Sequence, residues 1–405
     1  MAYRLSARCC LVAAALVVGC RGEPAPGPGP PRAPVEHGAA PAAVVPRLPA
    51  SPDGAAEIRA LDRRIELHRG EPELAIALLL ARAQIRGRLD DYLEAERRSA
   101  AWVAERPELR AAWQARVEVL TRIHEVAAAR AALDRLRALV RDPGELDGLA
   151  AAIDALAGGP GTARAAAYAE RMARDYPDPT SLTRWAGSLA AAGRTDDALA
   201  VMQRVPAAVH DNPPELLSWL LFQWGRIHEA RGEPAAARAF YAAAHARMPA
   251  LEVTVHLAQA IAATSGDPGA LIAAALAGDR HPALLALAGR LDDAAREWER
   301  YAAALPRAFA GQAARFYLDH GRDPLRDPAR ALALAQADRA GRDTPEVRAL
   351  VVEAALAAGD AAEACAQAPG LAHGAPAHQF LAWRAFTACR RTDEAGALAA
   401  RLGLR

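Results

Sequence analysis

Residues 218–251, SWLLFQWGRIHEARGEPAAARAFYAAAHARMPAL, contain two runs of helix-forming residues separated by a glycine. Gly232 can take the left-handed conformation that ends a helix, and Pro249 prevents the second run from continuing as a helix. Ala237 and Ala244 lie two turns apart on one face of the second run, so the two helices can approach closely. The stretch therefore predicts a helical hairpin, which needs stacked neighbours to bury its apolar face.

The same stretch resembles one unit of the tetratricopeptide repeat, a helix-turn-helix of about 34 residues. The matching positions are Leu221, Trp224, Gly225, His228, Gly232, Ala237, Tyr241, Ala244 and Pro249. Trp224 replaces the family's leucine and His228 replaces its aromatic residue, at similar size. The resemblance implies an all-α, right-handed superhelix that binds other proteins.

Further glycines mark neighbouring units. The turn glycines are Gly193, Gly232, Gly266, Gly289, Gly321 and Gly359, with steps of 39, 34, 23, 32 and 38 residues by subtraction. In the unit that ends AREWERYAAALP, small and aromatic residues recur at the same spacing. Residues 53–405 are therefore predicted to form an α-solenoid of about ten tetratricopeptide-like hairpins, with a subdivision near 206–214.

Composition restricts the chemistry of the chain. Its 405 residues are 52% apolar but only 5% aromatic, so alanine and leucine must build most of the core. All 49 basic residues are arginine, and without lysine the chain cannot form a Schiff base or a phosphate-loop site. The formal net charge of +1 gives no sign of a nucleic-acid partner.

Catalytic and metal-binding motifs are incomplete in this sequence. The pairs His124-Glu125 and His228-Glu229 begin the zinc-protease pattern but lack its second histidine. The sequence therefore predicts neither an active site nor a metal site, and it indicates no cofactor and no small-molecule substrate. We expect the chain not to be an enzyme.

The first residues, MAYRLSARCCLVAAALVVGC, place two arginines before a short apolar run that ends at Cys20. The run is shorter than the ~20 residues of a membrane span, which favours a signal peptide over residues 1–19. The ending Val-Val-Gly-Cys resembles the bacterial lipobox. That resemblance implies cleavage before Cys20, acylation of its thiol and amino group, and attachment to the cell envelope, at the outer membrane facing the periplasm. An ordinary secretory signal or an uncleaved anchor is the alternative.

Residues 20–52 are rich in proline, alanine and glycine and show no amphipathic period. Such a stretch cannot bury enough apolar surface to order itself. We expect a disordered linker that, at ~3.1 Å per residue, reaches roughly 100 Å.

Cys365 and Cys389 are the cysteines that remain after removal of the signal and acylation of Cys20. An oxidising compartment and an even number favour a disulfide between them. Two buried free thiols are the alternative.

The resembled family also implies where a partner binds, because the first helix of each of its units lines a concave groove. Applied to the hairpin at 218–251, the family pattern selects Trp219, Phe222, Arg226 and Glu229. In the last unit it selects Phe380, Arg384 and Thr387. The alternative is that Trp219 and Phe222 pack against a neighbouring helix.

Three functions remain open from the sequence. The first is a lipid-anchored scaffold whose repeats bind envelope proteins. The second is a regulatory adaptor that stimulates a cell-wall enzyme. The third, an enzyme on an α-superhelical frame, would need a separate catalytic module.

Overall fold

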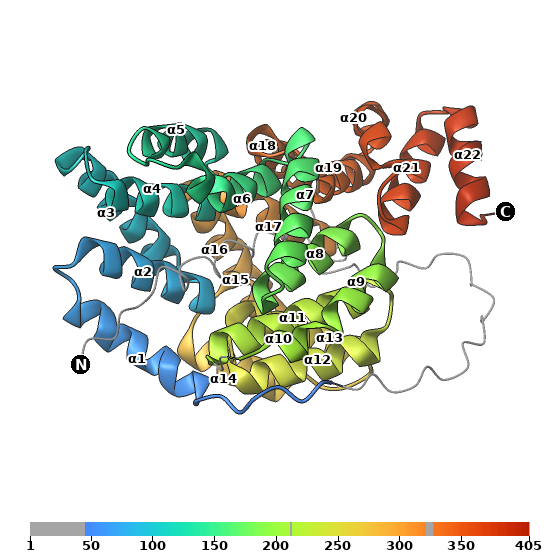
Figure 1. The fold of residues 1–405 in the computed structure, drawn as a ribbon. Coiled ribbons are helices and arrows are strands. Elements are labelled where there is room, and N and C mark those ends of the chain that lie inside the picture. Colours follow the sequence, from blue (N-terminus) through green and yellow to red (C-terminus); the bar gives the residue numbers. More distant parts are fainter. Residues whose placement is uncertain (1–44, 211–212, 321–326, 405) are drawn as a thin grey trace.

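The computed structural model describes residues 45–210, 213–320 and 327–404, and every regular element in these ranges is a helix (Figure 1). Cys20 and the predicted signal peptide lie outside the described residues. The helices are α1 (Gly54–Leu67), α2 (Pro72–Arg86), α3 (Leu89–Glu105), α4 (Arg110–Arg122), α5 (Val126–Arg137), η2 (Pro143–Leu146), α6 (Asp147–Ala157), α7 (Pro160–Asp175), α8 (Pro179–Ala191), α9 (Thr195–Met202), α10 (Val205–Ala208), α11 (Pro214–Ala230), α12 (Pro234–Arg247), α13 (Leu251–Ala263), α14 (Gly269–Gly278), α15 (Pro282–Leu287), α16 (Leu291–Ala304), α17 (Pro306–Asp319), α18 (Pro328–Gly341), α19 (Pro345–Ala358), α20 (Ala361–Gln367), η3 (Ala368–Leu371), α21 (Pro376–Ala388) and α22 (Thr392–Leu402).

Within the described ranges, consecutive helices pack as ten pairs, which confirms the predicted all-α solenoid of about ten hairpins. The pairs are α2–α3, α4–α5, α6–α7, α8–α9, α11–α12, α13–α14, α15–α16, α17–α18, α19–α20 and α21–α22. The α11–α12 pair packs as its sequence predicts. Ala237, Tyr241 and Ala244 are buried, and a Cβ atom on Gly225 would lie only 2.5 Å from the Tyr241 ring.

Most of the described hairpin turns contain a residue with positive φ. The N–H of the next residue donates a hydrogen bond to the carbonyl five residues before it. At the α11–α12 turn, Gly232 has φ 73° and Glu233 N–H donates to the His228 carbonyl over 3.0 Å. The prediction for Gly266 was wrong by one position, because Ser265 takes the left-handed conformation with φ 59°. Gly321 lies outside the described residues.

The chain completes more than one turn of the superhelix, and the second turn packs directly on the first. The Tyr301 hydroxyl donates to the Gly87 carbonyl over 2.9 Å, although 214 residues separate them. His124 Nδ1 lies 3.0 Å from the Arg307 carbonyl, 183 residues further on. Gly159 N–H donates to the Asp343 carbonyl over 3.0 Å. These contacts join α2–α7 to α15–α19, which lie side by side in Figure 1.

A shared hydrophobic core fills the boundary between the two turns. Leu136 and Leu156 from the first turn belong to the same buried cluster as Trp298 and Phe309 from the second. The ring of Tyr92 meets Phe309 edge-on, with centroids 5.9 Å apart. The two turns therefore pack directly against each other through a shared core, and no gap separates them there.

A second cluster runs from α7 to α13 without a break at the predicted subdivision near 206–214. Leu182 and Val205, which precede that segment, share this core with Leu217 and Phe240, which follow it. The structure thus places no boundary in the core at this point.

The last part of the predicted linker is ordered. Val45 and Leu48 pack against the α7–α13 core, and residues 45–52 run along α12 as an extended strap. The Arg247 guanidinium donates to the carbonyl of Pro49 over 2.7 Å and contacts the carbonyl of Leu48 and the hydroxyl of Ser51. The expectation of disorder through residue 52 was wrong for this strap, because backbone carbonyls can be ordered by a distant arginine.

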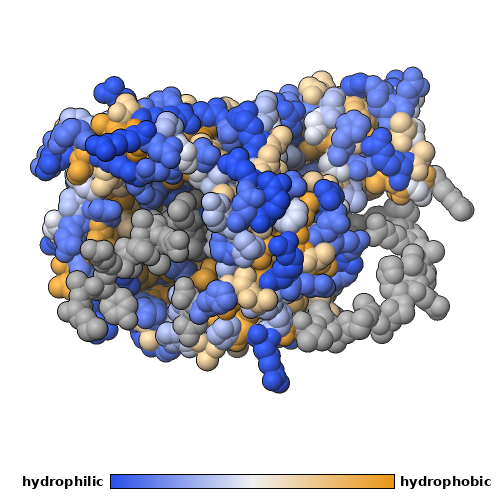
Figure 2. Space-filling model, viewed as in Figure 1, coloured by the Kyte–Doolittle hydropathy of each residue, from blue (hydrophilic) through white to orange (hydrophobic). Residues whose placement is uncertain are grey.

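Hydrophilic residues are spread over the face drawn in Figure 2, with smaller hydrophobic patches between them. Among the described helices, none is both long enough and apolar enough to cross a membrane.

Candidate functional site

The groove residues predicted on α11 are buried. Trp219 is 6% exposed and Phe222 is 1% exposed. The Phe222 ring lies 5.2 Å from His256 of α13 and 5.5 Å from Tyr241 of α12. The expectation that both side chains are open to a partner is therefore corrected, because neighbouring helices cover this face of α11.

Arg226 and Glu229 are held in a polar network within the protein. The Tyr241 hydroxyl donates to Glu229 over 2.7 Å, and His256 Nδ1 lies 3.3 Å from the same carboxylate. Arg226 lies 3.5 Å from Glu229 and 3.9 Å from Glu252. Burial raises the pKa of Glu229, but the neighbouring His256 and Arg226 and the hydrogen bond from the Tyr241 hydroxyl outweigh it, so that pKa is lowered. This network fixes α11 to α12 and α13.

A cavity of about 50 Å³ remains where α2 meets α11 and α13. Trp219 and Phe222 form part of its wall, with Glu215, Glu252 and Gln84 as polar members. The Trp219 indole N–H has no hydrogen-bond acceptor among the described residues. Trp219 and Phe222 of the α11 stripe are thus buried beside a small cavity, whose lining also includes the exposed Glu215.

Several charged side chains have pKa values that desolvation shifts, and the sequence did not reveal them. Desolvation raises the pKa of Glu118 to about 7 and also raises the pKa of Glu215 and Glu252. Desolvation lowers the pKa of Arg122, which makes no ion pair within 4.0 Å among the described residues. Charges on otherwise apolar helices were the only available signal, and that signal does not identify which neighbours surround them.

The residues predicted on α21 are exposed, in contrast to those on α11. Phe380 is 41% exposed, and Arg384 and Thr387 are also exposed. The Phe380 ring lies 5.3 Å from Trp383, and the Thr387 hydroxyl donates to the Trp383 carbonyl over 2.8 Å. Because α21 belongs to the last hairpin, no later hairpin among the described residues covers this stripe. We call Phe380, Trp383, Arg384 and Thr387 the α21 surface.

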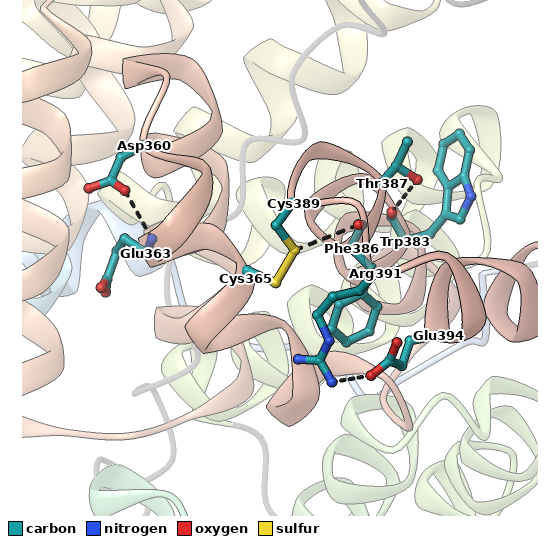
Figure 3. Close-up of a disulfide and its surroundings, with 9 residues drawn as sticks. All are labelled: Asp360, Glu363, Cys365, Trp383, Phe386, Thr387, Cys389, Arg391 and Glu394. Atoms are coloured by element: carbon teal, nitrogen blue, oxygen red, sulfur yellow. Dashed lines mark hydrogen bonds and ion pairs between the residues drawn. A yellow bond between two sulfur atoms is a disulfide. The ribbon is translucent and has the colours of Figure 1, made fainter.

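A disulfide joins Cys365 of α20 to Cys389 at the end of α21 (Figure 3). Arg391 lies over the Phe386 ring at 4.8 Å and pairs with Glu394, the third residue of α22. The disulfide attaches the last hairpin to the one before it, and Arg391 joins α21 to α22 within the last hairpin. The α21 surface therefore sits on a fixed support.

The described residues contain no group of three or more His, Cys, Asp or Glu side chains arranged to hold a metal ion. No protein-family model matches the chain, and no curated protein matches it.

Solved structures that resemble the chain are tetratricopeptide repeat proteins. The Cut9 and Hcn1 hetero-tetramer of the APC/C matches with 13% identity and a TM-score of 0.38, over 85% of this chain and 58% of that chain. A tetratricopeptide repeat protein from Parabacteroides merdae matches with 14% identity and a TM-score of 0.30, over 69% of this chain and 91% of that chain. The TPR domain of P58(IPK) matches with 12% identity and a TM-score of 0.23, over 84% of this chain and 95% of that chain.

Reduction should loosen the last hairpin. The disulfide closes a loop across a separation of 24 residues, which corresponds to about 3 kcal/mol of stabilisation in the chain-entropy account. We expect Cys365→Ser with Cys389→Ser to increase hydrogen exchange in α21 and α22 and to leave α11 and α12 unchanged. The chain with both serines should not respond to reductant. Two titratable thiols at these positions in the unreduced, denatured chain would contradict the disulfide.

Glu118 should make stability depend on pH. Its pKa is about 7 in the folded state, above its ordinary value of 4.5, so the folded state binds its proton more tightly than the unfolded state. The free energy of unfolding should therefore fall as pH rises from about 4.5 to about 7. Glu118→Gln should remove that part of the slope and stabilise the protein at pH 8 by more than about 1 kcal/mol. Denaturant titration at pH 5 and pH 8 measures both effects, and an unchanged slope would refute the assignment.

Proposed function

We propose that this chain is a non-catalytic, lipid-anchored scaffold of the bacterial envelope whose last hairpin binds another protein. The observation that carries the proposal is the exposed α21 surface. It groups an exposed phenylalanine, a partly buried tryptophan and an arginine on one helix. Aromatic residues and arginine are enriched in the residues that dominate binding energy at protein interfaces.

The contacts that hold α21 in place support the proposal. A binding residue costs less to order when its support is already rigid. Here Cys389 ties α21 to α20, and Ala382 and Phe386 are buried against the preceding hairpin. The exposed side of α21 is therefore presented on a rigid frame.

The N-terminal sequence supports the anchoring part of the proposal. Cys20 follows a short apolar run, and each buried methylene of an attached acyl chain contributes about 0.8 kcal/mol to membrane binding. The strap at residues 45–52 is held on α12, so the chain between Cys20 and Val45 would set the distance from the membrane to the solenoid.

A photo-reactive residue at the α21 surface tests the scaffold directly. We expect a benzoyl-phenylalanine at position 380 or 384 to give the same discrete adduct with one protein in the cells that make this chain. Tyr176 is 66% exposed on another hairpin, and the same probe there should not give that adduct. Equal adducts from 176 and 380, or no adduct from 380 and 384, would contradict the proposed surface.

Two variants separate binding from anchoring. Arg384→Glu should remove the adduct at position 380 and leave the protein with the membranes. Cys20→Ala should release the protein from the membranes or block its processing. Unchanged membrane retention and unchanged mass of the Cys20→Ala protein would contradict the lipid anchor while leaving the α21 surface intact.

A further inference from the structure

We infer that the surface under the strap is a binding site for an extended segment of another protein, and that the strap at residues 45–52 is an internal ligand that competes for it. We call this surface the strap face. It is the part of the α7–α13 core that Val45 and Leu48 cover, together with Arg247 at the end of α12. The strap face contains no residue of α21, so the inference goes beyond the proposed function and either one can fail while the other holds.

The Arg247 guanidinium recognises the backbone of the strap. It donates to the Pro49 carbonyl over 2.7 Å and to the Leu48 carbonyl over 3.3 Å. It also donates to the Ser51 hydroxyl over 3.2 Å, and among the described residues every hydrogen bond of this guanidinium goes to the strap. Contacts to carbonyls depend little on the side chains of the bound segment, and peptide-binding modules that add a strand obtain affinity from main-chain hydrogen bonds in the same way.

Two apolar side chains of the strap supply selectivity. Val45 and Leu48 are partly buried against the core, whereas Arg47 and Pro49 are exposed. Their interval of three residues is one turn of an extended, proline-rich segment, so the two side chains share one face. The prolines of the strap favour that form before docking, which lowers the entropy lost on binding. The strap face therefore fits an extended segment with two apolar side chains three positions apart.

The strap is separable from the core that it covers. The fully buried members of that cluster lie between Ala173 and Ala260, and the strap contributes only the partly buried Val45 and Leu48. The ten helix pairs are also complete without the strap. Its release therefore leaves the helices packed and uncovers an apolar surface beside a guanidinium.

Trypsin cleavage of the full-length chain after Arg47 tests whether the strap is displaced by a competitor. The competitor is a synthetic peptide of residues 44–52 with Arg47→Gln, which keeps both apolar side chains and offers trypsin no site. We expect this peptide, at a concentration of about millimolar, to speed cleavage after Arg47 at least about threefold, because it occupies the strap face in place of the strap. The same peptide with Leu48→Asp should leave the rate unchanged.

Direct binding completes the test. In the full-length chain with Val45→Asp and Leu48→Asp the internal strap no longer competes. The fluorescein-labelled peptide should therefore bind this variant at least about tenfold more tightly than it binds the unchanged chain. Adding Arg247→Ala should weaken that binding about tenfold. Arg238→Ala is the matched control on α12, because Arg238 donates to Thr264 and not to the strap, and it should not change the binding.

An unchanged rate of cleavage after Arg47 in the presence of the peptide would overturn the inference, and this result does not depend on whether the variant with two aspartates folds. Equal binding of the Leu48→Asp peptide, or no binding of the labelled peptide to the folded variant, would also overturn it.

Discussion

The contact between the two superhelical turns is the constraint on which the rest of the structure depends. A solenoid in which each repeat touches only its neighbours has a stability that is close to a sum of local terms. In this chain Tyr301, Phe309 and His124 add contacts between residues about two hundred positions apart, and a single buried cluster includes side chains from both turns. In the described part of the chain, Phe380, Arg384 and Thr387 of α21 stay exposed.

The repeat unit could be predicted because its causes are local. Small residues such as Ala237 and Gly225 permit close helix packing, and Gly232 ends α11 in the left-handed conformation. The degenerate units were harder to recognise because His124, Ser265 and Arg390 take the same conformation without being glycine. Their neighbours complete the same backbone hydrogen bond, as Arg391 N–H does to the Phe386 carbonyl over 2.8 Å. The backbone pattern is thus kept where the sequence signal is lost.

The candidate site was only partly predictable, for a different physical reason. The helical period selects residues that share one face of α11 or α21, but it does not determine what lies opposite that face. Opposite α11 lie α2, which is distant in the sequence, and α13 of the next hairpin, and Trp219 and Phe222 are buried there. No later hairpin in the described part of the chain covers α21, so Phe380 is exposed. Likewise the order of residues 45–52 depends on Arg247, a residue nearly two hundred positions away.

Native-state hydrogen exchange in increasing denaturant tests the packing of the two turns most directly. Because α4–α6 and α17–α19 share one core, their amides should open with the same free energy and the same dependence on denaturant. Tyr301→Phe removes the hydrogen bond to Gly87. It should lower the free energy of opening of α4–α6 and that of α17–α19 by the same amount, about 1 kcal/mol. If α4–α6 instead opened at a clearly lower free energy while α17–α19 stayed protected, the turns would be independent and the account would be wrong.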